Sequence, residues 1–112
     1  MTKATLTSII LLLALPLLSA PPQDAYAQDR SDLGASLRAI RPLMRDDPYR
    51  AVSMLKALKD RYPQHSRVYI MLGDTYQVIG DHEAARQAYR ECLEIDPNNH
   101  QAGAALGMLR RQ

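Results

Sequence analysis

The chain has 112 residues, the length of one small domain, and 46% of them are hydrophobic and 23% charged, as in an ordinary globular protein. The formal net charge is +2, which is too small to indicate a nucleic-acid or acidic-membrane partner. A single cysteine, Cys92, excludes a disulfide framework within the chain.

The first segment, residues 1–27, has the pattern of a signal peptide. A lysine near the start is followed by an apolar stretch at 6–18 and by an Ala-Tyr-Ala cleavage motif that ends at Ala27. The alternative is an uncleaved membrane anchor, but a spanning helix needs about 20 apolar residues, and this stretch is shorter and contains Pro16. We therefore expect cleavage after Ala27, with Ala20 as the weaker candidate, and a periplasmic or secreted protein without a stable membrane span.

The next segment predicts an amphipathic helix after a short extension at 28–31. Its apolar residues recur at helical spacing: Leu33, Leu37, Ile40, Leu43 and Met44. Asp29, Ser31 and Asp32 are candidates for its N-terminal cap. Pro42 lies inside the pattern and removes one backbone hydrogen bond. We expect either a kink or a break near Arg41 followed by one short turn.

A second helix is predicted from Pro48 to about Tyr62. Asp47 is a suitable cap, Pro48 suits the first turn, and Pro63 ends the helix. One face of this helix is apolar and consists of Ala51, Val52, Leu55 and Leu58.

Residues 66–99 predict a helix, a tight turn and a second helix. Gly80 allows the left-handed conformation that ends a helix, and Asp81 is a good cap for the next one. Gly73 removes a side chain where another helix would approach closely. After Pro97, an asparagine is placed to cap a further helix.

These residues also carry a motif. It reads Tyr69-x2-Leu72-Gly73-x2-Tyr76, then Ala85-x3-Tyr89-x2-Cys92, then Pro97. In type and spacing the stretch resembles one tetratricopeptide repeat (TPR), whose period is about 34 residues. Tyrosines stand where the family usually has Trp and Phe, and Cys92 stands where a small Ala is usual.

The resemblance extends to both flanks. One period before residues 85–97, matching residues at 51–63 indicate a degenerate repeat at 32–65; one period after Leu72-Gly73, the pair Leu106-Gly107 indicates a closing helix at 100–112. The resemblance implies an all-α, TPR-like α-solenoid of antiparallel helix pairs, with five helices and about two and a half repeats. About three repeats are normally needed for stability, so we expect a partner or self-association to stabilise the chain.

The sequence offers little catalytic chemistry. His65, His82 and His100 lie at predicted helix boundaries and lack the close pairing of zinc ligands. Cys92 is either a buried small side chain or a reactive thiol, and no basic residue is placed to lower its pKa. We predict no catalytic, metal or cofactor site, and a protein that is not an enzyme.

The resemblance implies that the first helix of each repeat lines a concave groove for a protein partner. The candidate partner-binding residues lie on the 66–79 helix outside its core stripe, and in the turn after the next helix: Arg67, Ile70, Met71, Asp74, Gln77, Val78, Asn98 and Asn99. The flanking helices would add Leu33, Leu37, Ile40, Gln101, Ala104 and Met108. In the competing interpretation, the polar candidates are merely solvated and Ile70 and Met71 pack against the first helix.

Two functions follow. The first is an exported adaptor or scaffold that binds a segment of another envelope or secretion-related protein in the groove. The second is a permanent accessory subunit that packs into a larger complex through its first repeat or convex face. The Lys and Asn set with which some TPR domains grip a C-terminal carboxylate does not assemble in this sequence.

Overall fold

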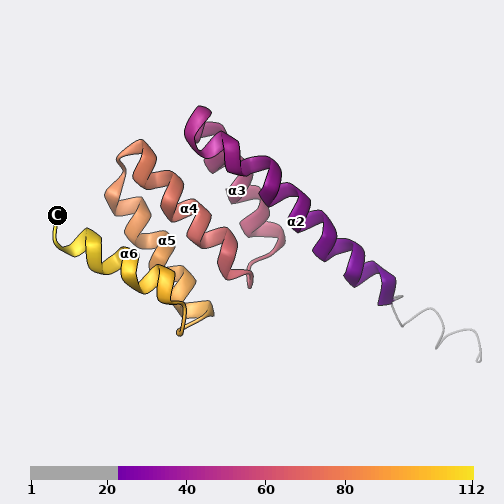
Figure 1. Ribbon diagram of the computed structural model, residues 1–112. Coiled ribbons are helices and arrows are strands. Elements are labelled where there is room, and N and C mark those ends of the chain that lie inside the picture. Colours follow the sequence, from indigo (N-terminus) through magenta and orange to yellow (C-terminus); the bar gives the residue numbers. More distant parts are fainter. Residues whose placement is uncertain (1–22) are drawn as a thin grey trace, which may run out of the picture. The chain divides into compact units, whose positions relative to one another are not determined.

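The computed structural model describes residues 23–112, with side chains from Asp29 onward, and this part of the chain is all-α (Figure 1). Its helices are α2 (Gln23–Asp46), α3 (Pro48–Arg61), α4 (Ser66–Ile79), α5 (His82–Ile95) and α6 (His100–Arg110). Contacts divide the chain into units 1–32 and 33–112, and the packing below is that of the second unit. The signal-peptide prediction falls largely outside the described residues and stays a prediction.

Helix α2 differs from the prediction at both ends. It begins at Gln23, because the stretch from there to Leu33 contains neither Pro nor Gly, so Asp29 and Asp32 lie inside the helix and not at its cap. It also runs through Pro42 to Asp46, so a break near Arg41, one of the two predicted alternatives, is wrong, and the other alternative, a kink, stays a prediction. Pro42 is exposed, and water can hydrogen bond to the carbonyl that the proline leaves without an amide donor.

The helix ends fall where the sequence predicted caps. Asp47 Oδ1 accepts a hydrogen bond from the Arg50 amide at 3.3 Å, and Asp81 Oδ1 accepts one from the Ala84 amide at 3.1 Å. Asn99 Oδ1 accepts from the Ala102 amide at 3.0 Å. Gly80 ends α4 with a φ of 91°, in the left-handed region. These caps set the short turns that fold each helix back on its predecessor.

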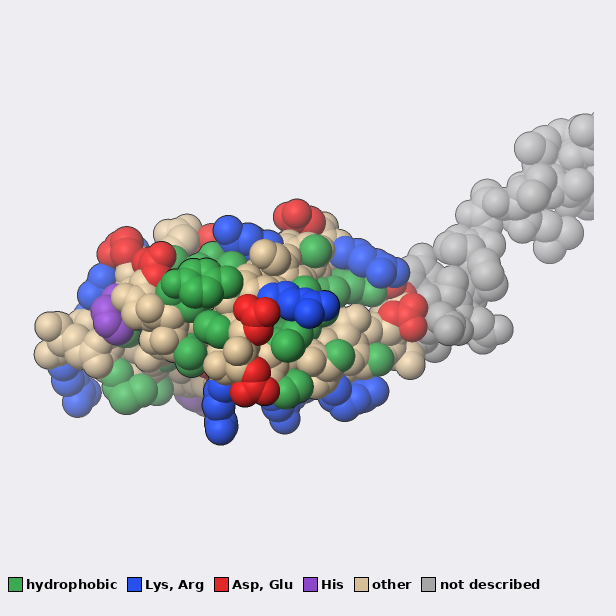
Figure 2. All heavy atoms as spheres, turned by 90° about the horizontal axis from the view of Figure 1, so that it is seen from above, with side chains coloured by type: hydrophobic (Ala, Val, Ile, Leu, Met, Phe, Trp, Pro, Cys, Tyr) green, Lys and Arg blue, Asp and Glu red, His purple; other side chains and the backbone are tan. Residues whose placement is uncertain are grey.

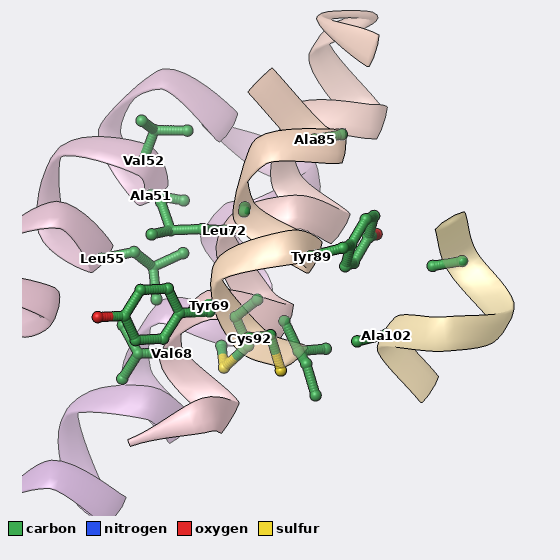
Figure 3. Packing of buried hydrophobic residues seen from close by; sticks show 14 of the residues in the cluster. Ala51, Val52, Leu55, Val68, Tyr69, Leu72, Ala85, Tyr89, Cys92 and Ala102 are labelled. Atoms are coloured by element: carbon green, nitrogen blue, oxygen red, sulfur yellow. The ribbon is translucent and has the colours of Figure 1, made fainter. Parts of the chain in front are cut away.

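One hydrophobic core joins the helices of the second unit. Helix α3 packs on α4, α4 on α5, and α5 on α6, and Figure 3 shows side chains of all four meeting in this core. Tyr89 of α5 is fully buried. A Cβ added at Gly73 would lie 2.5 Å from the Tyr89 ring, so the glycine permits the close approach of α4 and α5. The chain has the all-α, TPR-like fold that the sequence predicted.

In the described part of the chain, no helix combines the length and apolar character that crossing a membrane would require.

Candidate functional site

A pocket of about 200 Å³ lies between α2, α4 and α6. We call it the groove pocket. The residues that line it come from all three helices: Arg41, Met44, Arg67, Ile70, Met71, Asp74 and Gln101. Four of the predicted partner-binding residues, all on α4, therefore lie around one pocket, and the pocket also includes Gln101, predicted from the flanking helix.

Apolar side chains of α4 form the floor of the pocket. Ile70 and Met71 are only 7% and 6% exposed, so most of each side chain packs in the core and only an edge faces the pocket. The competing interpretation, in which Ile70 and Met71 pack inside the domain, is therefore correct for most of the surface of both side chains. Met44 of α2 is half-buried and packs against the same core.

Two arginines stand at the rim of the pocket. Arg41 comes from α2 and Arg67 from the first turn of α4, and both are exposed. Among the described residues neither guanidinium has a hydrogen bond or an ion pair. The pocket therefore offers unpaired positive charge beside an apolar floor.

The acidic residue of the pocket is tied to the core. The Tyr89 hydroxyl donates a hydrogen bond to Asp74 Oδ1 at 2.6 Å and accepts one from Gln77 Nε2 at 2.6 Å. Burial, together with the hydrogen bond to Asp74, raises the pKa of Tyr89 above its usual value. Asp74 and Gln77 are thus not merely solvated, because both hold the Tyr89 ring in place. This network was not predicted, because nothing in the sequence pattern places a core tyrosine next to these two polar groups.

The remaining predicted residues lie away from the groove pocket. Val78 is 54% exposed near the end of α4, Asn98 is exposed in the turn, and Asn99 caps α6. The apolar residues expected from the first helix are buried at 3%, 6% and 0% exposure, so they are not offered to a partner: Leu33, Leu37 and Ile40. Ala104 and Met108 are exposed on α6 but do not line the pocket.

Sequence reasoning missed Arg41 and Met44. The apolar stripe already placed Met44 on this helix, but only Leu33, Leu37 and Ile40 were expected to face a partner. An unbroken helix places Arg41 and Met44 opposite the start of α4.

A second, larger hollow of about 440 Å³ lies between the turn before α4 and helix α5. Two carboxylates line it, Glu91 and Glu94. Glu91 forms an ion pair with Lys59 and accepts a hydrogen bond from Gln87 Nε2 at 3.0 Å. Burial raises the pKa of the Glu91 carboxyl, but the hydrogen bonds from Lys59 and Gln87 outweigh this effect, so the pKa is lowered overall. Lys59 also lies 5.2 Å from the centre of the Tyr69 ring. This hollow therefore presents acidic and polar groups to a partner, whereas the groove pocket presents two arginines without an ion pair.

Cys92 is a buried thiol. It is fully buried and free, its Sγ lies 3.5 Å from the Ser66 carbonyl oxygen, and burial raises the pKa of the thiol. The structure confirms the buried interpretation over the reactive one. Within residues 23–112, no three His, Cys, Asp or Glu side chains are grouped so that they could hold a metal ion.

Comparison with known proteins agrees with the helical fold. Residues 66–99 match the family model of the tetratricopeptide repeat. These residues are α4, α5 and the turns that follow them, and the match supports a TPR protein. TPR solenoids use extended concave surfaces to bind other proteins.

One curated relative is similar over part of the chain. Over 60 residues the chain is 38% identical to a protein of Schizosaccharomyces pombe named general transcriptional corepressor ssn6. The alignment covers 50% of this chain and 5% of that protein. No solved structure matches the chain significantly.

Proposed function

We propose that the protein is a non-enzymatic, exported TPR adaptor that binds a segment of another protein across α2, α4 and α6. The observation that carries the proposal is the groove pocket, where an apolar floor lies beside two arginines without partners. TPR-like packing supports a protein as the ligand, because stacked helix pairs form extended surfaces and not enclosed cavities.

The size of the pocket supports the same class of ligand. Sites for small molecules typically enclose about 300–1,000 Å³, whereas the groove pocket has about 200 Å³. Such a volume suits one or two side chains of a polypeptide that continues over the neighbouring surface. A segment that lies across three helices would gain the rest of its affinity from contacts beside the pocket.

The permanent-subunit alternative predicts an apolar patch on α2 of the isolated chain. Instead, Leu33, Leu37 and Ile40 are buried within the chain, and Leu43 and Met44 pack against the core. In the part of the chain whose side chains are described, the exposed large hydrophobic residues lie on three different helices: Tyr49, Met54, Val78 and Met108. This distribution favours the adaptor over the subunit. Self-association stays a prediction, and a melting temperature that rises with protein concentration would support it.

Site-specific cross-linking in the native cell tests the adaptor proposal. A photoreactive amino acid replaces Gln101 in the groove pocket, and the matched control replaces Arg90, an exposed residue of α5. We expect one dominant cross-linked protein from position 101 and none from position 90. Equal capture from both positions, or capture from position 90 alone, would contradict the proposed face.

Export needs its own measurement, because it rests on the leader pattern at 1–27 alone. We propose that the mature chain begins at Gln28 in a periplasmic or secreted fraction. The N-terminal sequence of the protein purified from its native cell tests this. An intact Met1 on cytosolic protein would contradict it and would leave the groove proposal standing.

A further inference from the structure

We propose that the segment bound in the groove pocket is acidic, with an Asp or Glu side chain of the partner held between Arg41 and Arg67. This inference rests on the proposed function and specifies the chemistry of the partner. A residue beside the acidic one is apolar, because Ile70 and Met71 form the floor beside the two arginines.

The charges around the pocket carry this inference. Arg41 also lines a neighbouring hollow of about 390 Å³ with Arg45, so three arginines gather at this edge of α2 and α4. Among the described residues, none of the three has an ion pair. A guanidinium binds a carboxylate through two parallel hydrogen bonds, which are stronger than bonds between neutral groups.

The arginines outnumber the acidic groups nearby. Asp74 lines the pocket together with Arg41 and Arg67, and one of its oxygens accepts the hydrogen bond from the Tyr89 hydroxyl. Asp46 lies in the neighbouring hollow and makes no ion pair with Arg41 or Arg45. The arginines therefore remain available to a carboxylate brought by a partner.

A protein acid fits this surface better than a nucleic acid. A phosphate backbone is bound by a row of basic side chains, whereas the groove pocket brings two arginines together with Asp74. The side of the molecule that Figure 2 draws also has acidic, basic and hydrophobic side chains interspersed. The net charge of +2 also offers little general attraction for a polyanion. Two arginines beside an apolar floor match one acidic residue next to one apolar residue.

A display selection against the full chain tests the proposal. The library presents random peptides between two domains of a carrier, so that no peptide has a free C-terminus. Binding of the selected peptides is then measured for wild type, Arg41→Gln, Arg67→Gln, Gln101→Trp and the control Arg90→Gln. Gln101→Trp fills the pocket from an exposed position without changing charge, and Arg90→Gln removes an exposed arginine of α5.

We expect selected peptides to share an acidic residue with an apolar residue beside it. Replacing that Asp or Glu by its amide should weaken binding about tenfold or more, as loss of a charge-assisted pair does. Arg41→Gln and Arg67→Gln should cause a similar loss, and Arg90→Gln should cause none.

The other outcomes separate this inference from the proposed function. If the selected peptides lack acidic residues but Gln101→Trp still abolishes their binding, the acidic specificity is overturned and groove binding stands. Acidic peptides that bind Arg41→Gln and Arg67→Gln as tightly as wild type would also overturn it. Selected peptides insensitive to Gln101→Trp, or no selected peptide at all, would overturn both proposals.

Discussion

Two glycines one repeat apart have opposite surroundings. Gly73 on α4 and Gly107 on α6 each follow a leucine in the same motif. A Cβ on Gly73 would lie 2.5 Å from the Tyr89 ring, whereas a Cβ on Gly107 would have nothing within 4 Å. The same residues are therefore essential to packing at one position and not at the other.

The difference lies in the helix that faces each glycine. On α4 the Leu-Gly pair faces α5, and the Tyr89 ring fills the space that Gly73 leaves. Among the described residues, no helix covers Gly107 in the same way. A repeat motif thus marks where a helix can be approached closely, and the following helix decides whether the space is filled. The predictions below test this contrast in order of expected effect.

The leucine pair should show the largest effect. Leu72 is 3% exposed in the core, whereas Leu106 is only partly buried. Leu72→Ala should lower the free energy of unfolding by about 2–5 kcal/mol, because it leaves a cavity as well as losing apolar contacts. Leu106→Ala should cost clearly less, since its surroundings are partly open to water. Urea unfolding of both variants measures the difference, and equal losses would contradict the contrast.

The glycine pair should differ in sign. Gly73→Ala should lower the free energy of unfolding by about 1–3 kcal/mol through overpacking, because the Tyr89 ring is buried and held by Asp74 and Gln77. Gly107→Ala should raise it by about 0.5–1 kcal/mol, because alanine favours the helix and meets no neighbour. Chemical denaturation tests both, and stabilisation by Gly73→Ala would show that the ring moves freely.

Tyr89→Phe should have a smaller effect. The variant keeps the ring but removes the hydroxyl that Asp74 and Gln77 bind, a loss of about 1–2 kcal/mol. The pKa of Tyr89 is raised in the folded protein, so above about pH 10 the unfolded chain loses this proton first. Wild type should therefore lose stability with rising pH more steeply than Tyr89→Phe. Parallel pH profiles would show that the hydroxyl is not protected by folding.

The rim of the groove pocket should show the smallest effect on stability. Arg67→Gln should change the free energy of unfolding by less than about 0.5 kcal/mol, as is usual for an exposed side chain without a partner. Asp74→Asn provides the contrast, because it weakens the hydrogen bond to Tyr89 and should destabilise measurably. Thermal melts of the two variants, compared at one protein concentration, show which residue has a structural role. A lower melting temperature for Arg67→Gln than for Asp74→Asn would contradict this assignment.

Local signals predicted most of the fold. Asp47, Asp81 and Asn99 cap helices and Gly80 ends one, because each of these residue types satisfies a backbone requirement that depends only on its neighbours. Pro42 left two alternatives, a kink or a break, and the break did not occur: α2 continues through the exposed proline.

The candidate site was less predictable. The residues of α4 that lie outside its core stripe were the candidates, and four of them line the groove pocket: Arg67, Ile70, Met71 and Asp74. Helical spacing predicts which side of a helix a residue lies on, but not which residues of another helix lie opposite. It therefore did not predict that Asp74 accepts a hydrogen bond from Tyr89 or that Arg41 lies at the rim of the groove pocket. Both depend on how separate helices pack, which the spacing along one helix does not encode.

The central claim is that the face formed by α2, α4 and α6 binds the partner. Backbone amide chemical shifts of the full chain test it most directly. They are recorded while a peptide from the display selection is titrated in. The account predicts the largest changes at Arg41, Arg67 and Gln101, with α3 and the outer side of α5 unaffected. Changes centred on Glu91 and Glu94 would contradict it and would assign binding to the other hollow.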